Sequence, residues 1–328
     1  MRPTRSVQHR LRARRPLRGS FDHESLGEAI RIAVLYRKGR YFGAYAEQLA
    51  DALRRLGAEV ETRNESQVLG DQDATLVVGL HEFDRRALRR MARRSLLVGV
   101  QTEQLATPQQ GAEEFGGLRR PAIRRNLRLM DAVFDWSRAN ARSLAAVHPV
   151  AEWVPYGLCE ADIAETQMRR EPAAEQFDVV FLGDVHALDG RRQRILTQLA
   201  SRFSVNPQHG GSWGAKKLDV LRSGRIVLNL HVEASGTFES PRFYDAMGAG
   251  VPVVSEPVLD PAPFESDRDF LEVNPATLVP TIERLLGDDS LRLELIENAL
   301  RTVRQHGMER SAVAILRRIL IAHSRHRS

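Results

Sequence analysis

The residues with the clearest chemical potential lie between Arg225 and Ser255. An apolar run that ends in Asn-Leu-His231 leads into a polar loop and then into a helical stretch carrying Arg242 and Asp245. Side chains three positions apart share one face of a helix, so this arginine and this carboxylate are expected to lie side by side. From the residues alone, such a pair is a helix surface ion pair worth at most a few tenths of a kcal/mol.

A second chemical segment is Phe181-Leu-Gly-Asp-Val-His-Ala-Leu-Asp-Gly-Arg-Arg192. It has the pattern of a strand, a glycine turn at Gly183 and a helix that starts with two arginines, Arg191 and Arg192. A helix N-terminus attracts phosphate through its free N–H groups and its dipole, and guanidinium groups add bidentate contacts. Arginines at a solvated helix start are common, however, so this segment alone leaves phosphate binding and plain solvation equally open.

Several enzyme classes lack their signatures in this chain. One cysteine, no His-Glu-x-x-His and no close pair of metal-spaced histidines in the strand-end loops argue against a zinc site, and no metal site is predicted. The sequence contains no Gly-x-Ser-x-Gly elbow of hydrolases and no Walker loop. The first apolar run is followed by Arg37-Lys-Gly-Arg-Tyr-Phe-Gly43, which is not the glycine pattern of dinucleotide dehydrogenases.

The elements that must position these residues alternate between apolar strands and amphipathic helices. In the first half we expect strands at 30–36, 59–62, 75–80, 95–100, 132–136 and 152–155, with helices at 45–56, 85–93, 119–130 and after Ser137. In the second half we expect strands at 177–183, 203–205, 226–230 and 251–255, helices at 191–202, 216–222 and 241–247, and a helical tail from 275. This alternation predicts parallel sheets covered by helices on both faces.

The predicted organisation is an α/β fold of two Rossmann-like halves facing each other across a cleft. We expect a basic, disordered tail at 1–28, a first half at 29–157, a polar linker at 158–176 and a second half at 177–305. Residues 306–328 are expected to form a helix that packs back across the halves. Open α/β sheets bind ligands at the carboxyl ends of their strands, so candidate chemistry is expected in the loops that line this cleft.

Composition narrows the class of protein. The 328 residues correspond to about two domains. The single cysteine, Cys159, excludes an internal disulfide and favours a reducing, cytoplasmic setting. No stretch approaches the roughly 18 apolar residues of a membrane helix, so a secreted disulfide scaffold and an integral membrane protein are both excluded.

The net charge of +6 belongs to the start of the chain. Residues 1–20 hold seven arginines and no acidic residue, which leaves 41 basic against 42 acidic residues in the remainder. Such a tail is either a disordered leader or a weak contact for an anionic surface. The remainder lacks the basic surface and motifs of a nucleic-acid-binding protein, so no specific nucleic-acid partner is expected.

The segment 225–255 resembles the donor-site signature of group 1 glycosyltransferases of the GT-B fold, and it is most similar to their CgeB-like (spore-maturation-type) branch. The family shows a Glu-Ala-Met-Ala-x-Gly-x-Pro-Val run, which corresponds here to Asp245-Ala-Met-Gly-Ala-Gly-Val-Pro-Val253. The larger retaining group carries another glutamate eight positions upstream, where this chain has Thr237. CgeB-like members tend to lack that glutamate and have an arginine at the position of Arg242, while Glu239 is out of register for it.

The similarity continues on both sides of this segment and is good over about 130–300. Val179-Val-Phe-Leu-Gly183 resembles the family's strand and glycine turn, and Ser223–Leu230 resembles its approach to the donor loop. Phe134-Asp-Trp-Ser137 and Val154-Pro-Tyr-Gly157 resemble its strand-serine and hinge motifs. The resemblance implies transfer of a sugar from a nucleotide-diphosphate sugar to an acceptor hydroxyl, with retention of configuration and no cofactor beyond the donor.

The resemblance also implies roles for individual residues. Asp245 would accept hydrogen bonds from ribose hydroxyls, and cations would neutralise the diphosphate without a metal. The donor set is Gly183, Arg191, Arg192, Lys217, His231, Arg242 and Asp245. His81 and Glu103 follow strands of the acceptor half, where either could orient or deprotonate an acceptor hydroxyl or simply be a hydrogen-bonded loop residue. Trp213 either borders the nucleobase or packs in the core.

Three other functions stay open on the sequence alone. A non-catalytic GT-B protein would bind nucleotide sugars, or assemble with polysaccharide enzymes, without turnover. A sugar-nucleotide epimerase would convert the donor without an acceptor. A nucleic-acid-binding protein would depend on the arginine-rich start. The partners expected here are a nucleotide sugar and an unidentified hydroxyl acceptor, in the cytoplasm or at the inner face of the membrane.

Overall fold

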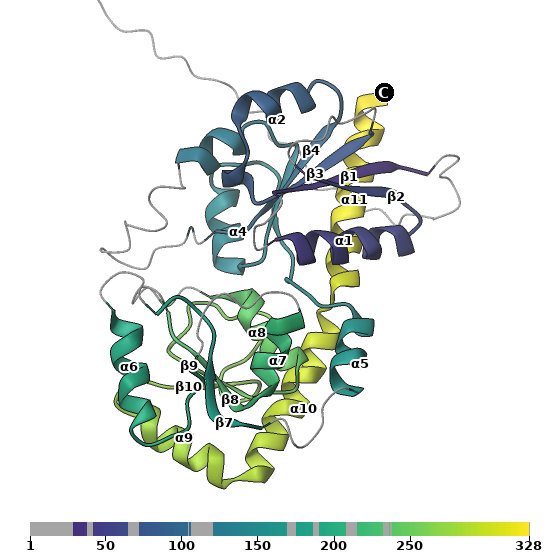
Figure 1. Cartoon of the computed structure of the whole chain (residues 1–328). Helices are drawn as coiled ribbons and strands as arrows, with labels where there is room; N and C mark the ends of the chain where they lie inside the picture. The colour runs from purple at the N-terminus through teal and green to yellow at the C-terminus, as the bar shows by residue number, and fades with distance from the viewer. Residues whose placement is uncertain are drawn as a thin grey trace, which may run out of the picture.

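The computed structural model describes residues 29–37, 42–64, 72–103, 105, 121–168, 175–185, 190–207, 215–231, 236 and 238–327. They form two α/β halves, drawn as the upper and lower parts of Figure 1. The N-terminal half contains a six-stranded sheet in the order β2-β1-β3-β4-β5-β6, and the C-terminal half contains a four-stranded sheet in the order β10-β9-β8-β7. Every strand pairing in both sheets is parallel, which confirms the predicted α/β architecture.

The N-terminal half follows the predicted alternation closely. Its elements are β1 (Arg31–Tyr36), α1 (Gly43–Arg55), β2 (Glu59–Asn64), β3 (Ala74–Val78), the short 3-10 helix η2 (Leu80–Glu82), α2 (Arg85–Met91), β4 (Leu96–Gln101), a helix at 121–127, β5 (Ala132–Asp135), α4 (Arg138–Ala145) and β6 (Ala151–Trp153). The central strands β3 and β4 are buried along their whole length, as parallel strands covered on both faces must be. Ser137 caps α4 by accepting a hydrogen bond from the backbone N–H of Asn140, as predicted.

The C-terminal half is built on a shorter sheet. Its elements are β7 (Phe177–Phe181), α6 (Arg191–Ala200), α7 (Ala215–Arg222), β8 (Gly224–Asn229), α8 (Ser240–Gly248), β9 (Val253–Ser255), β10 (Leu271–Glu272), α9 (Leu278–Gly287) and α10 (Asp289–Gln305). The strand predicted at 203–205 is wrong, because only Val205 forms a single bridge, to Val179. The side chain of Asn206 accepts a hydrogen bond from the backbone N–H of Phe181 and donates one to its carbonyl. It therefore provides the hydrogen-bond partners that a neighbouring strand would give to the edge of β7.

The polar linker predicted at 158–176 contains a helix and core residues. Helix α5 spans Glu160–Met168, and Leu158, Cys159 and Ile163 are buried. The acidic residues that suggested a linker include two in the first turn of α5, where the helix dipole favours negative charge. This segment has few apolar residues, and they pack between larger elements. Over so short a segment their spacing shows no clear helical period.

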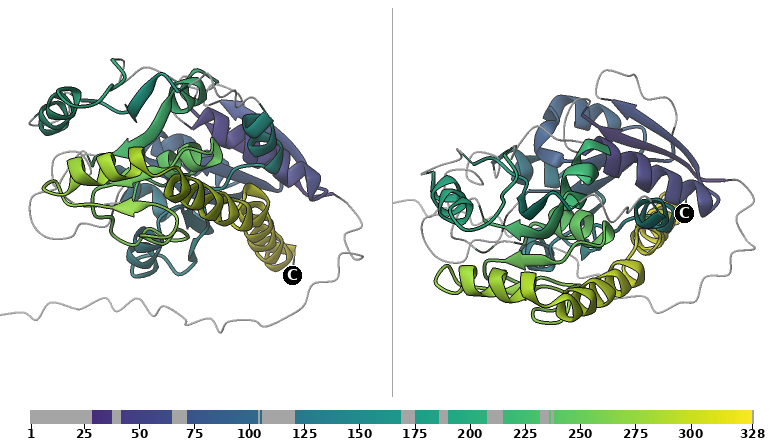
Figure 2. Two further views of the ribbon diagram at one scale, coloured as in Figure 1. Left: turned by 90° about the horizontal axis from the view of Figure 1, so that it is seen from below. Right: turned by 60° about the horizontal axis from the view of Figure 1, so that its bottom comes forward.

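The last helix connects the two halves. Helix α11 (Met308–Arg327) starts beside the C-terminal half and runs along α1 of the N-terminal half, as Figure 2 shows from two further directions. Ser311 donates a hydrogen bond to the carbonyl of Pro155 (2.6 Å), and the backbone N–H of Met308 donates to the carbonyl of Leu158 (3.1 Å). In the part of the chain that the structure describes, no helix is long and apolar enough to cross a membrane.

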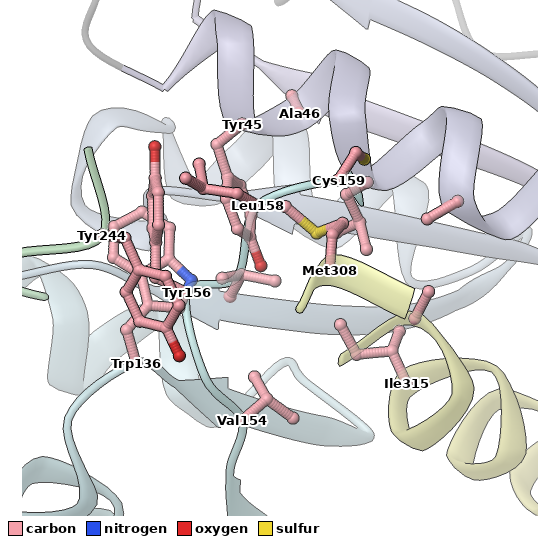
Figure 3. Close-up of a cluster of buried hydrophobic side chains, with 14 of the residues drawn as sticks. Tyr45, Ala46, Trp136, Val154, Tyr156, Leu158, Cys159, Tyr244, Met308 and Ile315 are labelled. Carbon is pink, nitrogen blue, oxygen red and sulfur yellow. The ribbon is translucent and has the colours of Figure 1, made fainter. Parts of the chain in front are cut away.

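A buried aromatic cluster lies between the halves (Figure 3). Tyr156 is at its centre: its ring stacks on Tyr45 of α1 at 5.2 Å, meets Trp136 edge-on at 4.9 Å and lies 5.8 Å from Tyr244 of α8, all between ring centroids. These rings belong to one continuous core that includes residues of both halves. Because Tyr244 directly precedes Asp245, the packing of this joint also fixes the helix that carries the candidate donor residues.

The carboxyl edges of the two sheets face each other, as predicted. Arg138 begins the helix that follows β5, and Asp260 lies in the loop that follows β9. The Nη2 atom of Arg138 is 2.6 Å from Oδ1 of Asp260, and the Nη1 atom of Arg142 is 3.1 Å from Oδ2. This ion-pair group joins the end of one sheet to the end of the other, so side chains at both edges are brought toward a common region.

Candidate functional site

Two arginines from different helices converge on Gly183, the residue that follows β7 and Leu182. A Cβ atom built on Gly183 would lie 3.3 Å from Nη1 of Arg192 and 3.3 Å from Nη2 of Arg242. Both guanidinium groups also lie over the ring of Phe181, at 5.4 Å and 5.7 Å from its centroid. Glycine is needed here because a side chain would also meet the Phe181 ring at 2.8 Å. Residues fifty positions apart in sequence thus form one cationic site.

The two guanidinium groups are held by the end of β8. Arg192 donates to the carbonyls of Leu230 (2.6 Å) and His231 (3.2 Å). Arg242 donates to the side-chain oxygen of Asn229, the last residue of β8. The carboxylate of Glu239 lies between them: it pairs with Arg242 and is 3.4 Å from Nη2 of Arg192. The carboxylate of Glu239 therefore contacts both cations.

Burial lowers the pKa of both arginines. Burial, followed by repulsion from Arg192, lowers the pKa of Arg242 to about 9, although Asp245 opposes the shift. Burial also lowers the pKa of Arg192 to about 10; Asp184 and then Glu256 oppose this shift, and repulsion from Arg191 adds to it. Burial disfavours the charged form of a guanidinium group, so both cations depend on nearby anions for stability. Phosphate oxygens are among the anionic groups that guanidinium groups bind through paired hydrogen bonds.

Asp245 lies on the same helix as Arg242 and is buried. Its Oδ2 atom is 2.5 Å from Nζ of Lys217, which extends from α7. Burial raises the pKa of Asp245, whereas Lys217 and then Arg242 lower it. Lys217 was expected beside the diphosphate cations; its contact in this structure is with Asp245, where it favours the charged carboxylate.

Arg191 and His231 are held by a carboxylate that the sequence did not single out. Arg191 pairs with Glu256, the buried residue after β9, through both carboxylate oxygens. Glu256 also accepts a hydrogen bond from the backbone N–H of His231 (2.9 Å), whose Nε2 lies 3.0 Å from the carbonyl of Pro257. Burial lowers the pKa of the His231 ring. Arg191 therefore has Glu256 as its ion-pair partner, and Arg192 and Arg242 are the cations that meet at Gly183.

The start of α8 adds a hydroxyl group to the site. Ser240 is the first residue of that helix, is 2% exposed, and its Oγ has no hydrogen-bond partner among the residues that the structure describes. It lies between Glu239 and Arg242 in sequence, at a helix end whose free N–H groups favour negative charge. In the sequence this residue is seen only as a serine before Pro-Arg. A single serine at a helix start is too common to be identified as a site residue from the sequence.

The N-terminal half brings His81 and Glu103 together. His81 lies in η2, after β3, and Glu103 follows β4. The Nε2 atom of His81 is 3.3 Å from Oε1 of Glu103 and 3.9 Å from Oε1 of Glu82. The side chains of His81 and Glu103 are only 8% and 17% exposed. The predicted placement at adjacent strand ends is thus confirmed, and the pair has the geometry to share a proton.

A buried polar network holds the backbone of Glu103. The side-chain amide of Gln101 accepts from the N–H of Glu103 (2.8 Å) and donates to its carbonyl (2.5 Å), while Asn140 donates to the same carbonyl (2.9 Å). Asp135 accepts hydrogen bonds from both amides and from the backbone N–H of Ser137. Burial raises the pKa of Asp135 to about 8, against the lowering effect of these donors.

Some predicted features lie outside the described residues. Trp213, Thr237 and the arginine-rich residues 1–20 belong to this group, so their predicted roles stay predictions. Among the described residues, the site also contains Asn229, Glu239, Ser240 and Glu256, which the motif comparison did not assign.

Comparisons with known proteins bear on the fold and on the C-terminal half of the chain. Residues 171–317 match a family model described as "Glycosyl transferase-like", and no curated protein matches the chain. Sucrose-phosphate synthase from Thermosynechococcus elongatus is similar in structure, with a TM-score of 0.62 and 14% identity over 89% of this chain and 99% of that one. Anabaena HepE in complex with UDP and glucose has a TM-score of 0.57 and 14% identity over 89% and 100%.

A third neighbour has a different provisional assignment. A Listeria monocytogenes protein, provisionally assigned as a UDP-N-acetylglucosamine 2-epimerase, has a TM-score of 0.54 and 14% identity over 88% of this chain and 95% of that one. At these identities the likeness establishes the fold, which is the two-domain GT-B fold. The activity must be argued from the site itself.

Proposed function

We propose that this protein transfers a sugar from a nucleotide-diphosphate sugar to a hydroxyl group of an acceptor. The observation that carries the proposal is the convergence of Arg192 and Arg242 on Gly183, where burial lowers the pKa of both guanidinium groups. A diphosphate carries negative charge and offers oxygens for bidentate contacts with both groups. Asp245, on the same helix as Arg242, has a carboxylate that can accept hydrogen bonds from the ribose of such a ligand.

In the proposed reaction, the bond between the anomeric carbon and the diphosphate oxygen breaks while the acceptor oxygen bonds to that carbon. Negative charge develops on the departing diphosphate, and Arg192 and Arg242 stabilise it as it forms. In this proposal the two arginines perform the charge neutralisation that a divalent cation provides in other enzymes. Retention of configuration is proposed from the family resemblance.

The acceptor hydroxyl loses a proton in this reaction, and His81 with Glu103 is the proposed recipient. A carboxylate 3.3 Å from Nε2 stabilises the protonated imidazole, so the pair is suited to general base catalysis. Gln101, Asp135 and Asn140 would act as positioning residues, because they hold the backbone of Glu103 and not the substrate.

Two finer assignments are also proposed. Membership in the CgeB-like branch is proposed from Arg242, three positions before Asp245. A cytoplasmic location is proposed from the single cysteine. Nucleotide base, sugar and acceptor are left to experiment.

A ligand screen tests the donor site. Thermal unfolding would be followed with UDP, GDP, ADP, CMP and their sugar conjugates, first with EDTA and then with Mg²⁺. A ligand at a hundredfold excess over its dissociation constant stabilises the folded state by about 2.7 kcal/mol. We expect one diphosphate to raise the midpoint without Mg²⁺, and Asp245→Asn to remove the shift. Asp219→Asn, an exposed carboxylate of α7, is the matched control and should respond like the wild type.

A turnover assay then separates the functions that share this fold. Transfer predicts release of the nucleoside diphosphate that increases with an added acceptor. Conversion of the donor sugar to its epimer with no acceptor would assign an epimerase, and binding without either reaction would assign a non-catalytic protein. No shift with any nucleotide would contradict the donor site.

A further inference from the structure

One face of the N-terminal half carries arginines that form no ion pair with a described residue. Helix α2 and the turn after it contain five exposed arginines, Arg86, Arg89, Arg90, Arg93 and Arg94. The helix at 121–127 and the turn after it contribute Arg124, Arg125 and Arg128, which are also exposed. None of these eight forms an ion pair with any residue that the structure describes. We call this set the arginine surface.

The two helices that carry the arginine surface form one rigid unit. Leu88 of α2 belongs to the same buried cluster as Ile123 and Leu127 of the neighbouring helix. The side chain of Asn126 donates to the carbonyls of Leu80 (2.8 Å) and Phe83 (3.1 Å), just before α2. Figure 1 shows α2 on the side of the N-terminal half away from the C-terminal half. The eight charges are therefore presented together by packed elements.

Several exposed arginines elsewhere in the described chain have acidic partners, whereas Arg284, Arg301, Arg310 and Arg317 form no ion pair with a described residue. Arg202 lies 3.3 Å from Glu283, and Arg304 lies 3.1 Å from Glu160. Arg54 and Arg268 likewise pair with acids of their own segments. Outside its first twenty residues the chain is almost neutral. What distinguishes the arginine surface is that eight arginines without an ion pair to a described residue lie on two helices that pack together.

This arrangement opposes the stability of the helices that carry it. Arg86 and Arg90, and Arg124 and Arg128, are four positions apart, a spacing at which like charges repel. Arg86 is also in the first turn of α2, where no acidic residue is present and the helix dipole disfavours a cation. A partner with distributed negative charge would offset these costs.

We propose that the arginine surface docks this protein on an anionic lipid bilayer. Guanidinium groups bind phosphate oxygens in pairs, and a membrane presents many such groups over a broad area, as the two helices present their arginines. The large exposed apolar side chains, Val147, Leu259, Leu293 and Val313, all lie outside these helices, so docking is electrostatic and reversible.

A membrane fits this surface better than a nucleic acid does. Between its arginines α2 has only alanine, leucine and methionine, without the aromatic or amide side chains that stack on bases or read their edges. The segment that carries His81 leads directly into α2, whose cap is Asp84. Docking would thus bring the acceptor half to the bilayer. This inference does not depend on sugar transfer, because it concerns a surface outside the proposed site.

Vesicle co-sedimentation of the full chain tests the proposal. Vesicles of phosphatidylcholine with about 30% phosphatidylserine are compared with pure phosphatidylcholine, at the low salt concentrations where surface charges attract. We expect binding to the anionic vesicles alone, with release as salt rises. The variant R86Q/R89Q/R90Q/R93Q should bind at least about a hundredfold more weakly, since each basic residue near such a surface contributes about fivefold. Its thermal midpoint should be equal to or above that of the wild type.

Two further variants keep the test specific. R54Q/R202Q/R268Q/R304Q removes the same charge from exposed, paired positions and should bind within a few fold of the wild type. A variant with the seven arginines of residues 1–20 replaced by glutamine separates the tail from the arginine surface. The proposal is overturned if only the tail variant loses vesicle binding, or if both four-arginine variants lose it equally. It is also overturned if the wild type prefers a single-stranded oligonucleotide to the vesicles.

Discussion

Replacing Glu239 by glutamine should strengthen the binding of a nucleoside diphosphate while it weakens the folded protein. Glu239 is the carboxylate that faces both Arg192 and Arg242, so in the unliganded protein it occupies the position of a counterion. A diphosphate that contacts the same guanidinium groups must share them with this negative charge. Glutamine keeps the size and a hydrogen-bond acceptor but removes the charge.

The magnitude follows from the geometry. Oε1 of Glu239 is 3.4 Å from Nη2 of Arg192. A phosphate oxygen about 3 Å beyond that guanidinium group would lie about 6–7 Å from the carboxylate. Two unit charges at this separation repel by about 2.5 kcal/mol at an effective dielectric constant of about 20. Because the side chain can rotate, we expect Glu239→Gln to tighten binding by between about tenfold and about a hundredfold.

The opposite effect is expected on stability. Without Glu239 the two arginines repel each other with less compensation, and a charge-assisted contact is lost, so the free energy of unfolding should fall by about 1–3 kcal/mol. Calorimetric titration with the diphosphate selected by the ligand screen, together with urea unfolding, measures both quantities. Glu283→Gln, an exposed partner of Arg202, is the control and should change neither. Weaker binding by Glu239→Gln would refute this reasoning, because Glu239 would then be holding the arginines in place for the ligand.

The remaining predictions concern three other residues. Burial raises the pKa of Asp135 to about 8, so the folded protein retains a proton that the unfolded chain releases near pH 4; this group's contribution to the free energy of unfolding should fall by about 1.4 kcal/mol for each pH unit between about 5 and 7. Asp135→Asn should remove that slope in urea unfolding at several pH values, and an unchanged slope would contradict the assignment. Gly157 has φ +69°, and an added Cβ would lie 2.5 Å from the backbone nitrogen of Met308, so Gly157→Ala should destabilise the protein by about 2–4 kcal/mol. At Gly57 φ is +88° but no atom lies within 4 Å of an added Cβ, so Gly57→Ala should lower the free energy of unfolding only by the backbone strain of about 1–2 kcal/mol. Equal losses of stability in the two variants would show that the contact with Met308 of α11 does not destabilise Gly157→Ala. His81→Ala should lower turnover by about a hundredfold or more with the diphosphate affinity unchanged, whereas full turnover would exclude His81 as the base.

The sequence was sufficient for the parts of the fold that repeat a simple pattern. The strand expected at 95–100 is Leu96–Gln101, and the one expected at 226–230 is Gly224–Asn229. Because parallel strands end at a common edge, the pairing of His81 with Glu103 could be anticipated from two separate strand ends. Arg192 and Arg242 could be grouped only through the family resemblance, and the structure brings them together at Gly183.

What the sequence could not give depends on contacts between distant residues. Lys217 is close to Asp245 because α7 packs beside α8, and no local pattern in either helix encodes that neighbour. Gln101 and Asp135 are polar residues at the ends of apolar strands, and the pattern of neither strand indicates a partner for them. They bond to each other because β4 and β5 lie side by side in the sheet. Helix α5 was missed because its buried side chains fill the joint between the halves, with too few apolar positions to show a period.

The most direct test of the account is the charge preference of the donor site. Titration calorimetry would compare a nucleoside diphosphate with the corresponding nucleoside monophosphate, for the wild type and for Arg242→Gln. We predict that the wild type binds the diphosphate at least about tenfold more tightly and that Arg242→Gln loses most of this preference, because one of the two cations at Gly183 is gone. If Arg242→Gln retains the full preference for the diphosphate, the arginines at Gly183 do not form the donor site.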